Sequence, residues 1–362
     1  MKRIYNFSAG PSALPVEVLE KAQSEMLNYK NSGMSVMEMS HRSSVYGDIH
    51  AEAKADLKKL MCLNDDYEIL FLQGGGSTQF AMIPMNLLNK DDVASYLITG
   101  SWAEKAYKEA KKFANVEILD SSKEDTYTYI PEIDETKMDK DSKFLYMCVN
   151  NTIYGTRISR ELINKLTKPL VADISSNILS EKYDYNKFDL VFAGAQKNLG
   201  PAGVTIVALK KDLIGETRED IPTMLKYKTH LDKDSLYNTP PCYSIYITGL
   251  VCKWIKKMGG VEQMEKRNLE KANLLYDFID NSTLYKNNIK KEDRSLMNVV
   301  FVTGNDELDA KFVKGAKEKG LENIKGHRSV GGMRASIYNA MPIEGVKALI
   351  DYMKDFEMEN RW

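Results

Sequence analysis

A single lysine stands in a turn of small residues between two apolar runs of the sequence. Lys197 lies in "FDLVFAGAQKNLGPAGVTIVAL", residues 188–209, and both apolar runs have the character of buried strands. The glycines and alanines around it leave little bulk to screen its amine from a cleft. A lysine amine in such a setting can form a Schiff base with a carbonyl or move a proton. The alternative is a lysine that simply reaches solvent or a surface carboxylate.

A carboxylate ends the apolar run that precedes this one. Asp173 closes the strand-like "LVAD". Its carboxylate costs desolvation free energy there unless a cation or hydrogen-bond donors meet it. Asp173 could therefore face a charged ligand. It could equally cap a helix or accept a backbone N–H.

A glycine-rich turn joins a further apolar run to a helix-like segment in "LQGGGSTQFAMIPMNLL". Glycines allow the backbone to approach an anion, and a helix amino terminus supplies unpaired N–H groups. The turn, which includes Gly76 and Ser77, has neither the GK[ST] of a Walker A loop nor the spacing of a dinucleotide fingerprint. The alternative is a tight turn in which Ser77 or Thr78 caps the helix.

Trp102, in "TGSW", offers a flat ring after another apolar run, although most tryptophans lie in cores or interfaces. Together the sequence offers a phosphate cradle, a stacking ring, a buried acid and a lysine. Pyridoxal 5′-phosphate would use all four, through its phosphate, its ring, its ring nitrogen and its aldehyde. The sequence therefore predicts this cofactor, with Lys197 as the residue that carries it.

The elements that must position these groups alternate along the middle of the chain. Helix-period segments separate six short apolar runs: "YEILFLQ", "VASYLITG", "KFLYMCVN", "PLVADIS", "DLVFAG" and "GVTIVAL". Such alternation indicates a mostly parallel sheet covered on both faces. Ligands bind at the carboxyl ends of strands in these sheets. We place this large α/β domain at residues 16–260.

After "KKMGG" the pattern changes to long amphipathic segments around two strand candidates, "LMNVVFVTG" and "GMRASIYN". This pattern predicts a smaller α+β domain at residues 261–362, joined by residues 1–15.

Composition restricts the partners. The 50 lysines and arginines nearly balance the 51 aspartates and glutamates, so a net charge of −1 favours neither nucleic acid nor an anionic membrane. The four cysteines are dispersed, which suits neither a metal site nor a disulfide scaffold. The sequence shows no apolar run of membrane-spanning length, and we expect a cytoplasmic protein.

Several blocks, in this order, resemble the phosphoserine aminotransferase family of class V aminotransferases. These blocks are "YNFSAGPSALPVEVLEKAQ", "SVMEMSHRS", "LFLQGGGSTQF", "TGSW", "VADISS", "AGAQKNLGPAG", "YNTPP" and "VGGMRASIYNA". The resemblance implies the fold type I architecture, an α/β fold with a mostly parallel seven-stranded sheet in the large domain and a smaller α+β domain.

The resemblance also implies roles for individual residues. Lys197 would form the Schiff base, and Asp173 would face the ring nitrogen. The rest of the cofactor shell would be Gly76, Ser77, Trp102, Thr152 and Gln196, with Asn238 and Thr239 from the neighbouring subunit of a homodimer with shared active sites. One departure is Asn151, where many relatives carry an acidic residue.

Two of the four histidines directly precede an arginine, at His41-Arg42 and His327-Arg328. Guanidinium and imidazolium groups together match a dianionic phosphate. The resemblance makes these four residues the substrate-phosphate site, with His41 and Arg42 from the partner chain. It assigns the substrate α-carboxylate to Arg334. The alternatives are two unrelated surface pairs and an internal ion pair of Arg334.

The activity implied is transamination between L-glutamate and 3-phosphohydroxypyruvate, a phosphorylated 2-keto acid, in serine biosynthesis. Whether the longer phosphorylated keto acid of vitamin B6 (pyridoxine) biosynthesis is also a substrate stays open. The rivals are an alanine–glyoxylate or serine–pyruvate aminotransferase, a cysteine desulfurase, and a non-catalytic phosphate-binding protein. A desulfurase would need a mobile cysteine, and Cys242, beside "NTPP", is the residue that leaves this rival open.

Overall fold

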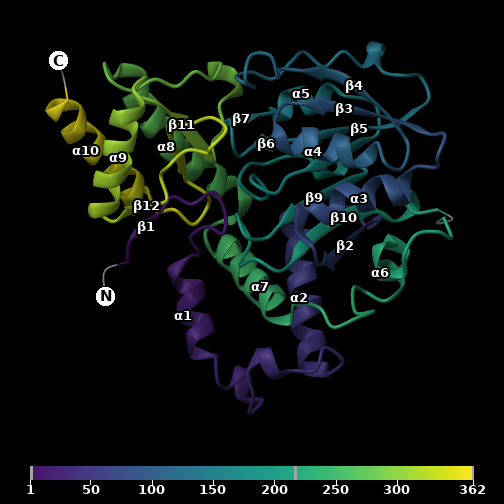
Figure 1. Cartoon of the computed structure of the whole chain (residues 1–362). Helices are drawn as coiled ribbons and strands as arrows, with labels where there is room; N and C mark the ends of the chain where they lie inside the picture. Colours follow the sequence, from purple (N-terminus) through teal and green to yellow (C-terminus); the bar gives the residue numbers. More distant parts are fainter. Residues whose placement is uncertain (1–2, 216–217, 361–362) are drawn as a thin grey trace.

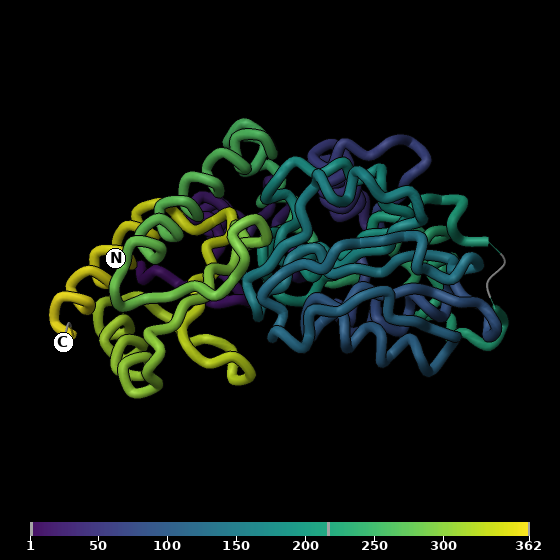
Figure 2. Tube along the Cα trace, turned by 90° about the horizontal axis from the view of Figure 1, so that it is seen from above, coloured from purple at the N-terminus to yellow at the C-terminus, as the bar shows by residue number. Residues whose placement is uncertain are grey.

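The computed structural model describes residues 3–215 and 218–360. Figure 1 shows a large sheet with helices beside a smaller group of elements that includes α8, α9 and α10. Seen from above in Figure 2, both termini lie on the side of the smaller group. Among the helices described, none combines the length and apolar character that a bilayer crossing needs.

The large sheet has seven strands in the order β2-β10-β9-β8-β5-β3-β4. Their bounds are Tyr67–Leu72 (β2), Val93–Ile98 (β3), Asn115–Ser121 (β4), Ser142–Cys148 (β5), Leu170–Asp173 (β8), Leu190–Gly194 (β9) and Thr205–Lys210 (β10). Strands β4, β3, β5, β8 and β9 pair in parallel, whereas β10 is antiparallel to both β9 and β2. All strands except β10 therefore point to the same edge.

The six predicted runs are confirmed as strands, and β4 is an additional one. It lies at the edge of the sheet, and no residue of β4 is buried. Its sequence, "NVEILDS", mixes polar and apolar residues because only one side of an edge strand is paired.

Helices cover both faces of the sheet. Side chains of α1 (Val16–Ser24), α2 (Ser44–Leu60), α5 (Arg160–Lys165) and α7 (Cys242–Lys257) share one buried cluster with the sheet. Side chains of α3 (Gly75–Leu87), α4 (Ser101–Ala110) and α6 (Tyr227–Asp232) share the opposite cluster. Successive residues of β2 alternate between the two clusters, as the pleat of a strand requires.

Helices α2 and α7 pack side by side and run in the same direction. Their contacts join successive positions in the same order: Tyr46 to Cys242, Ala53 to Gly249 and Asp56 to Lys256. The chain segments that precede the two helices therefore emerge at the same end of this pair.

A third buried cluster forms the smaller group. It joins Phe7 to side chains of α8 (Gly260–Asn281), β11 (Asn298–Phe301), α9 (Asp306–Glu318), β12 (Leu321–Glu322), β13 (Met333–Ser336) and α10 (Ile343–Glu359). Strand β1 (Tyr5–Asn6) pairs with β12, and the two predicted strands β11 and β13 pair with each other. Since Met264 of α8 belongs to the first cluster, α8 contributes to both cores. The domain boundaries at 15/16 and 260/261 stay a prediction.

Short elements complete the chain. Strands β6 (Asn150–Asn151) and β7 (Thr156–Arg157) pair after β5, and 3₁₀ helices lie at Tyr29–Asn31, Val36–Glu38, Glu135–Lys137, Tyr185–Lys187, Lys211–Leu213, Thr223–Leu225 and Lys291–Asp293.

Candidate active site

The predicted cofactor residues follow strands that end at the same edge of the large sheet. The glycine turn follows β2, Trp102 follows β3, Thr152 follows β5, Asp173 ends β8 and Lys197 follows β9. Because these five strands are parallel, their carboxyl ends bring all five groups to one place.

Lys197 is half-buried, and its Nζ donates a hydrogen bond to Thr152 Oγ1 at 2.9 Å. Burial lowers the pKa of Lys197, while the nearby charge of Asp173 acts in the opposite direction. The amine is thus turned into the site rather than toward bulk water. A less basic amine is better suited to nucleophilic and proton-transfer chemistry near neutral pH.

Asp173 is 7% exposed. Burial raises the pKa of its carboxyl, whereas the charge of Lys197 and hydrogen bonds from Ser175 lower it. The backbone N–H of Ser175 donates to Oδ1 at 2.9 Å, so the alternative role of accepting a backbone N–H is also present. The carboxylate retains the capacity to accept a hydrogen bond from a charged ring nitrogen.

The glycine turn opens α3 without a side-chain cap. Gly74 is the N-cap residue, with a φ of 89° that favours glycine. Thr78 Oγ1 donates back to Gly74 O at 3.0 Å, so neither Ser77 nor Thr78 caps the helix as the alternative interpretation supposed. The first N–H groups of α3 are therefore free of side-chain partners and can bind an anion.

Trp102 lies in the first turn of α4, near Asn151, the position at which many relatives carry an acidic residue. Asn151 Nδ2 donates to Thr99 Oγ1 and to Thr156 Oγ1, both at 3.1 Å. A Cβ at Gly100 would lie 2.5 Å from Asn151 Oδ1, so the start of α4 is packed directly on this side chain. The amide of Asn151 thus joins the ends of β3 and β5, and this amide supplies a donor that an aspartate would lack.

Arg334, in β13, reaches from the smaller group to the sheet edge. Its Nη1 donates to Thr152 O at 3.2 Å, and its Nε is buried without a partner. Burial lowers the pKa of Arg334. No carboxylate among residues 3–215 and 218–360 forms an ion pair with it, which argues against the internal ion pair.

His327 and Arg328 lie in a tight turn before β13, closed by a hydrogen bond from Gly326 N to Gly332 O at 2.8 Å. Desolvation lowers the pKa of His327, and the positive charges of Arg334, Arg328 and Lys105 lower it further. This part of the site is therefore electropositive before any substrate binds.

His41, Arg42, Asn238 and Thr239 lie at the shared end of α2 and α7. His41 is buried, and its Nε2 has no partner among the described residues. None of the described contacts joins His41 or Arg42 to Lys197. Asn238 and Thr239 lie beside Gln73 of their own chain, at the end of β2, through hydrogen bonds of 3.4 Å and 3.1 Å.

Gln196 folds back over the strand end, where a Cβ on Gly194 would lie 2.6 Å from its Oε1.

The amino-terminal segment also covers the lysine, which the residue patterns did not predict. Ser12 N donates to Gln196 O at 2.9 Å, Ser12 Oγ donates to Lys197 O, and a Cβ at Gly10 would lie 3.3 Å from Lys197 Cγ. The small residues of "SAGPS" could have indicated this contact, because only small residues allow the amino-terminal backbone to lie so close to Lys197.

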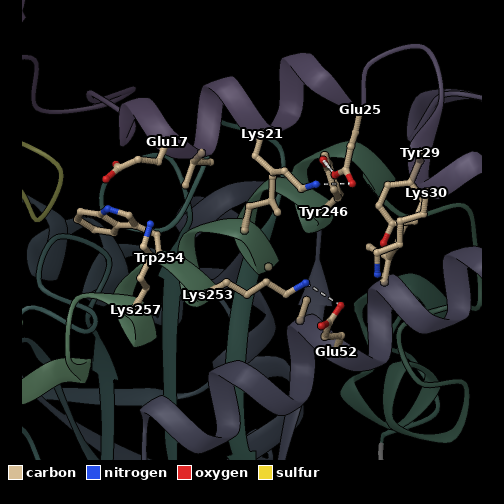
Figure 3. A pocket seen from close by; sticks show the side chains of 15 residues that line it. Glu17, Lys21, Glu25, Tyr29, Lys30, Glu52, Tyr246, Lys253, Trp254 and Lys257 are labelled. Carbon is tan, nitrogen blue, oxygen red and sulfur yellow. Dashed lines mark hydrogen bonds and ion pairs between the residues drawn. The ribbon is translucent and has the colours of Figure 1, made fainter.

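A separate cavity of about 250 Å³ lies between α1, α2 and α7 (Figure 3). None of the predicted site residues lines it. Four of its charged groups form two ion pairs, Lys253–Glu52 at 2.8 Å and Lys21–Glu25 at 2.9 Å. This arrangement does not point to a ligand.

Three of the four cysteines, including Cys242, give a desulfurase no support. Burial raises the pKa of Cys242, the first residue of α7, and the pKa values of Cys148 and Cys252 are also raised by burial. A nucleophilic cysteine needs the opposite shift.

Fold and site together define an enzyme of the aminotransferase class. The family model described as "Aminotransferase class-V" matches residues 4–349. Over all 362 residues the chain is 54% identical to the full length of a phosphoserine aminotransferase from Bacillus cereus. The chain belongs to the class-V aminotransferases, in the phosphoserine aminotransferase family.

Solved structures agree with this assignment. The phosphoserine aminotransferase from Bacillus circulans subsp. alkalophilus is 46% identical, with a TM-score of 0.95 and 100% of both chains covered. A pyridoxal-phosphate-bound phosphoserine aminotransferase from Trichomonas vaginalis is 37% identical, with a TM-score of 0.90, and the match covers 97% of this chain and 100% of that one. An alanine–glyoxylate aminotransferase from Nostoc sp. is 16% identical with a TM-score of 0.79, which shows a common fold alone.

Proposed function

We propose that this enzyme uses pyridoxal 5′-phosphate to transfer the amino group of L-glutamate to 3-phosphohydroxypyruvate. The products are 2-oxoglutarate and O-phospho-L-serine, an intermediate of serine biosynthesis. The observation that carries the proposal is that one sheet edge holds both a half-buried lysine amine and a buried carboxylate whose charges influence each other. Whether the enzyme also acts on the longer keto acid of vitamin B6 biosynthesis stays open.

The donor set fits this cofactor. The uncapped N–H groups of α3, with Gly76 and Ser77, match a phosphate, and Trp102 offers a half-buried ring for stacking. Asp173 offers a buried carboxylate for the ring nitrogen, whose positive charge would stabilise the ionised carboxylate. The remaining proposed contacts come from Thr152 and Gln196, with Asn238 and Thr239 of the neighbouring subunit.

When bound, the cofactor supplies an aldehyde that links covalently to amines and a ring that withdraws electrons from the substrate Cα. Lys197 would hold the cofactor through its amine. With a substrate amine bound in the site, Lys197 Nζ would serve as the base that removes the proton from the substrate Cα and would return a proton in the reverse half-reaction. Thr152 orients this amine through the 2.9 Å hydrogen bond.

Five residues would hold the substrate at its two ends. Arg334 would bind the α-carboxylate, because its guanidinium lies at Thr152 and lacks a carboxylate partner among the described residues. His327 and Arg328 would bind the phosphate, joined by His41 and Arg42 of the partner subunit. The γ-carboxylate of glutamate would use the phosphate position in the other half-reaction.

Replacing Arg328 with alanine is expected to lower kcat/KM for 3-phosphohydroxypyruvate about 10- to 100-fold, the loss of one charge-assisted interaction. Cofactor content should not change, because Arg328 is exposed and lies outside the proposed cofactor shell. Steady-state kinetics and the visible spectrum of the purified variant measure both. Unchanged kinetics would place the phosphate elsewhere.

The activity itself is tested by comparing 3-phosphohydroxypyruvate with hydroxypyruvate as amino acceptors. The proposed function requires a strong preference of the wild-type enzyme for the phosphorylated acid. Equal turnover of the two acids would favour a small-substrate aminotransferase instead.

A homodimer with shared sites is part of the proposal. His41-Arg42 and Asn238-Thr239 precede α2 and α7, whose amino ends lie together. Large apolar side chains near these segments are exposed: Leu27 (86%), Met34 (42%), Met37 (59%), Val45 (37%) and Tyr237 (47%). Figure 1 shows the segment between α1 and α2 projecting away from the sheet, where a second copy could cover it.

Mixing two variants of low activity tests the sharing of sites. Chains with Lys197→Ala and chains with Arg42→Ala, unfolded and refolded together in equal amounts, should recover about a quarter of the wild-type activity, because half the dimers are hybrids with one complete site. Each variant refolded alone is the control. If Arg42 served its own chain, no hybrid would contain a complete site and activity would not return.

A further inference from the structure

One cation near the site has no role in the assignments above. Lys105 lies in α4, three residues after Trp102 and four after Ser101, so all three share a face of the helix. Its Nζ lies 4.4 Å from the centroid of the Trp102 ring. Ser101 Oγ and Tyr154 OH, 2.7 Å apart, fix this face of α4 against the segment whose Thr152 carbonyl binds Arg334.

Lys105 differs from its neighbours on α4 in having no carboxylate partner. Lys108, one turn further, forms an ion pair with Glu104 at 2.7 Å, and Lys123 binds the same carboxylate. No ion pair of Lys105 occurs among residues 3–215 and 218–360. Its ammonium is held instead by the indole ring, an interaction that positions a cation without neutralising it.

The charge of Lys105 also acts on the proposed phosphate site. Together with Arg334 and Arg328, it lowers the pKa of His327, which lies on a different element. Three positive charges, on Lys105 in α4, Arg328 in the turn before β13 and Arg334 in β13, therefore all act on the His327 ring.

We propose that Lys105 is a specificity-determining residue that binds the phosphate of the substrate together with His327 and Arg328. The inference rests on the proposed function and extends its phosphate site to α4. A dianionic phosphate gains more from an additional cation than a monoanionic or uncharged group does, because Coulomb energy scales with the product of the charges. Trp102 would then position Lys105 as well as stacking on the cofactor ring.

The test compares the ratio of kcat/KM for 3-phosphohydroxypyruvate over hydroxypyruvate in four proteins. Lys105→Gln is expected to lower this ratio about 10- to 100-fold, whereas Lys105→Arg keeps most of it. Lys108→Gln makes the same charge change on the same helix but away from the site, and should leave the ratio at the wild-type value. The visible spectrum and thermal unfolding of each variant establish that cofactor and fold are retained.

A second measurement does not depend on activity. In the NMR titration of the free enzyme, Lys105→Gln should raise the pKa of His327, since a neighbouring positive charge is removed, and Lys108→Gln should not. The inference would be overturned if the Lys105→Gln variant kept both the wild-type ratio of kcat/KM values and the wild-type pKa of His327. A wild-type enzyme without preference for the phosphorylated acid would instead reject the proposed function.

Discussion

Replacing Lys197 with alanine is expected to lower the kcat of transamination by roughly 10⁴-fold or more, because the variant loses both the covalent anchor and the proton-transfer group. The buried surroundings of Lys197 contain no second amine in hydrogen-bond contact with Thr152 among the described residues. Steady-state assays with glutamate and 3-phosphohydroxypyruvate measure this loss. Borohydride reduction followed by peptide mass spectrometry should find the cofactor on Lys197 in the wild type and on no residue of the variant.

Lys165→Ala is the control for this variant, since Lys165 is an exposed lysine at the end of α5. Its activity and its reduced peptide should match those of the wild type. A Lys197→Ala protein that still turned over substrate, or that kept the covalent cofactor, would show that another amine carries the chemistry.

The second large effect is expected from Asp173→Asn. A neutral amide cannot stabilise a protonated ring nitrogen as a carboxylate does, so kcat should fall roughly 10²- to 10³-fold, the usual cost of removing one preorganised electrostatic group. The Asn side chain has nearly the same shape, so the hydrogen bond from Ser175 N is retained. Rapid-mixing measurements of each half-reaction should place the loss in proton removal at the substrate Cα.

The stability of the apoenzyme separates this effect from misfolding. Burial raises the pKa of Asp173, so the folded state keeps this proton to higher pH than the unfolded state does. Above the ordinary aspartate pKa the unfolded state therefore binds fewer protons, and the stability of the wild type falls as pH rises through this window. Asp173→Asn lacks this fall and should be at least as stable near pH 7.

Asp189→Asn is the matched control. Asp189 precedes β9 at the opposite edge of the sheet and pairs with Lys210 at 2.6 Å. The kcat of the Asp189→Asn variant should match that of the wild type. An Asp173→Asn enzyme with more than a tenth of the wild-type kcat would remove Asp173 from the ring-nitrogen role.

Much of the large sheet could be predicted from the sequence, because fully buried strands appear as continuous apolar runs between turns. The sheet edge then followed from the rule on carboxyl ends. Strand β4 escaped this pattern since an edge strand buries little. The direction of β10 could not be predicted either, because an apolar run has the same composition whether it lies parallel or antiparallel to its neighbour.

Lys105 shows why the rest of the site was harder to predict from the sequence. It lies in "WAEKAYKEAKKFAN", where Lys105, Lys108 and Lys111 all fit a solvated helix face. Only the three-dimensional structure shows that Lys105, and not one of the other two lysines, lies over the Trp102 ring. The common end of α2 and α7 was equally hidden, because the two helices are far apart in sequence and nothing local encodes the direction of their packing.

The antiparallel pairing of β9 and β10 has a consequence for how firmly Lys197 is held. The loop that carries Lys197 leaves one strand and returns along its immediate neighbour, so both of its ends are anchored in the interior of the sheet. Arg334 belongs to another core and meets the segment after β5 through the carbonyl of Thr152, while Asn339 of the same core donates its backbone N–H to Asn198 Oδ1, next to Lys197, at 3.0 Å. The smaller group is therefore bonded directly to the loop beside Lys197, so that the Arg334 guanidinium and the Lys197 amine are positioned by one connected set of hydrogen bonds.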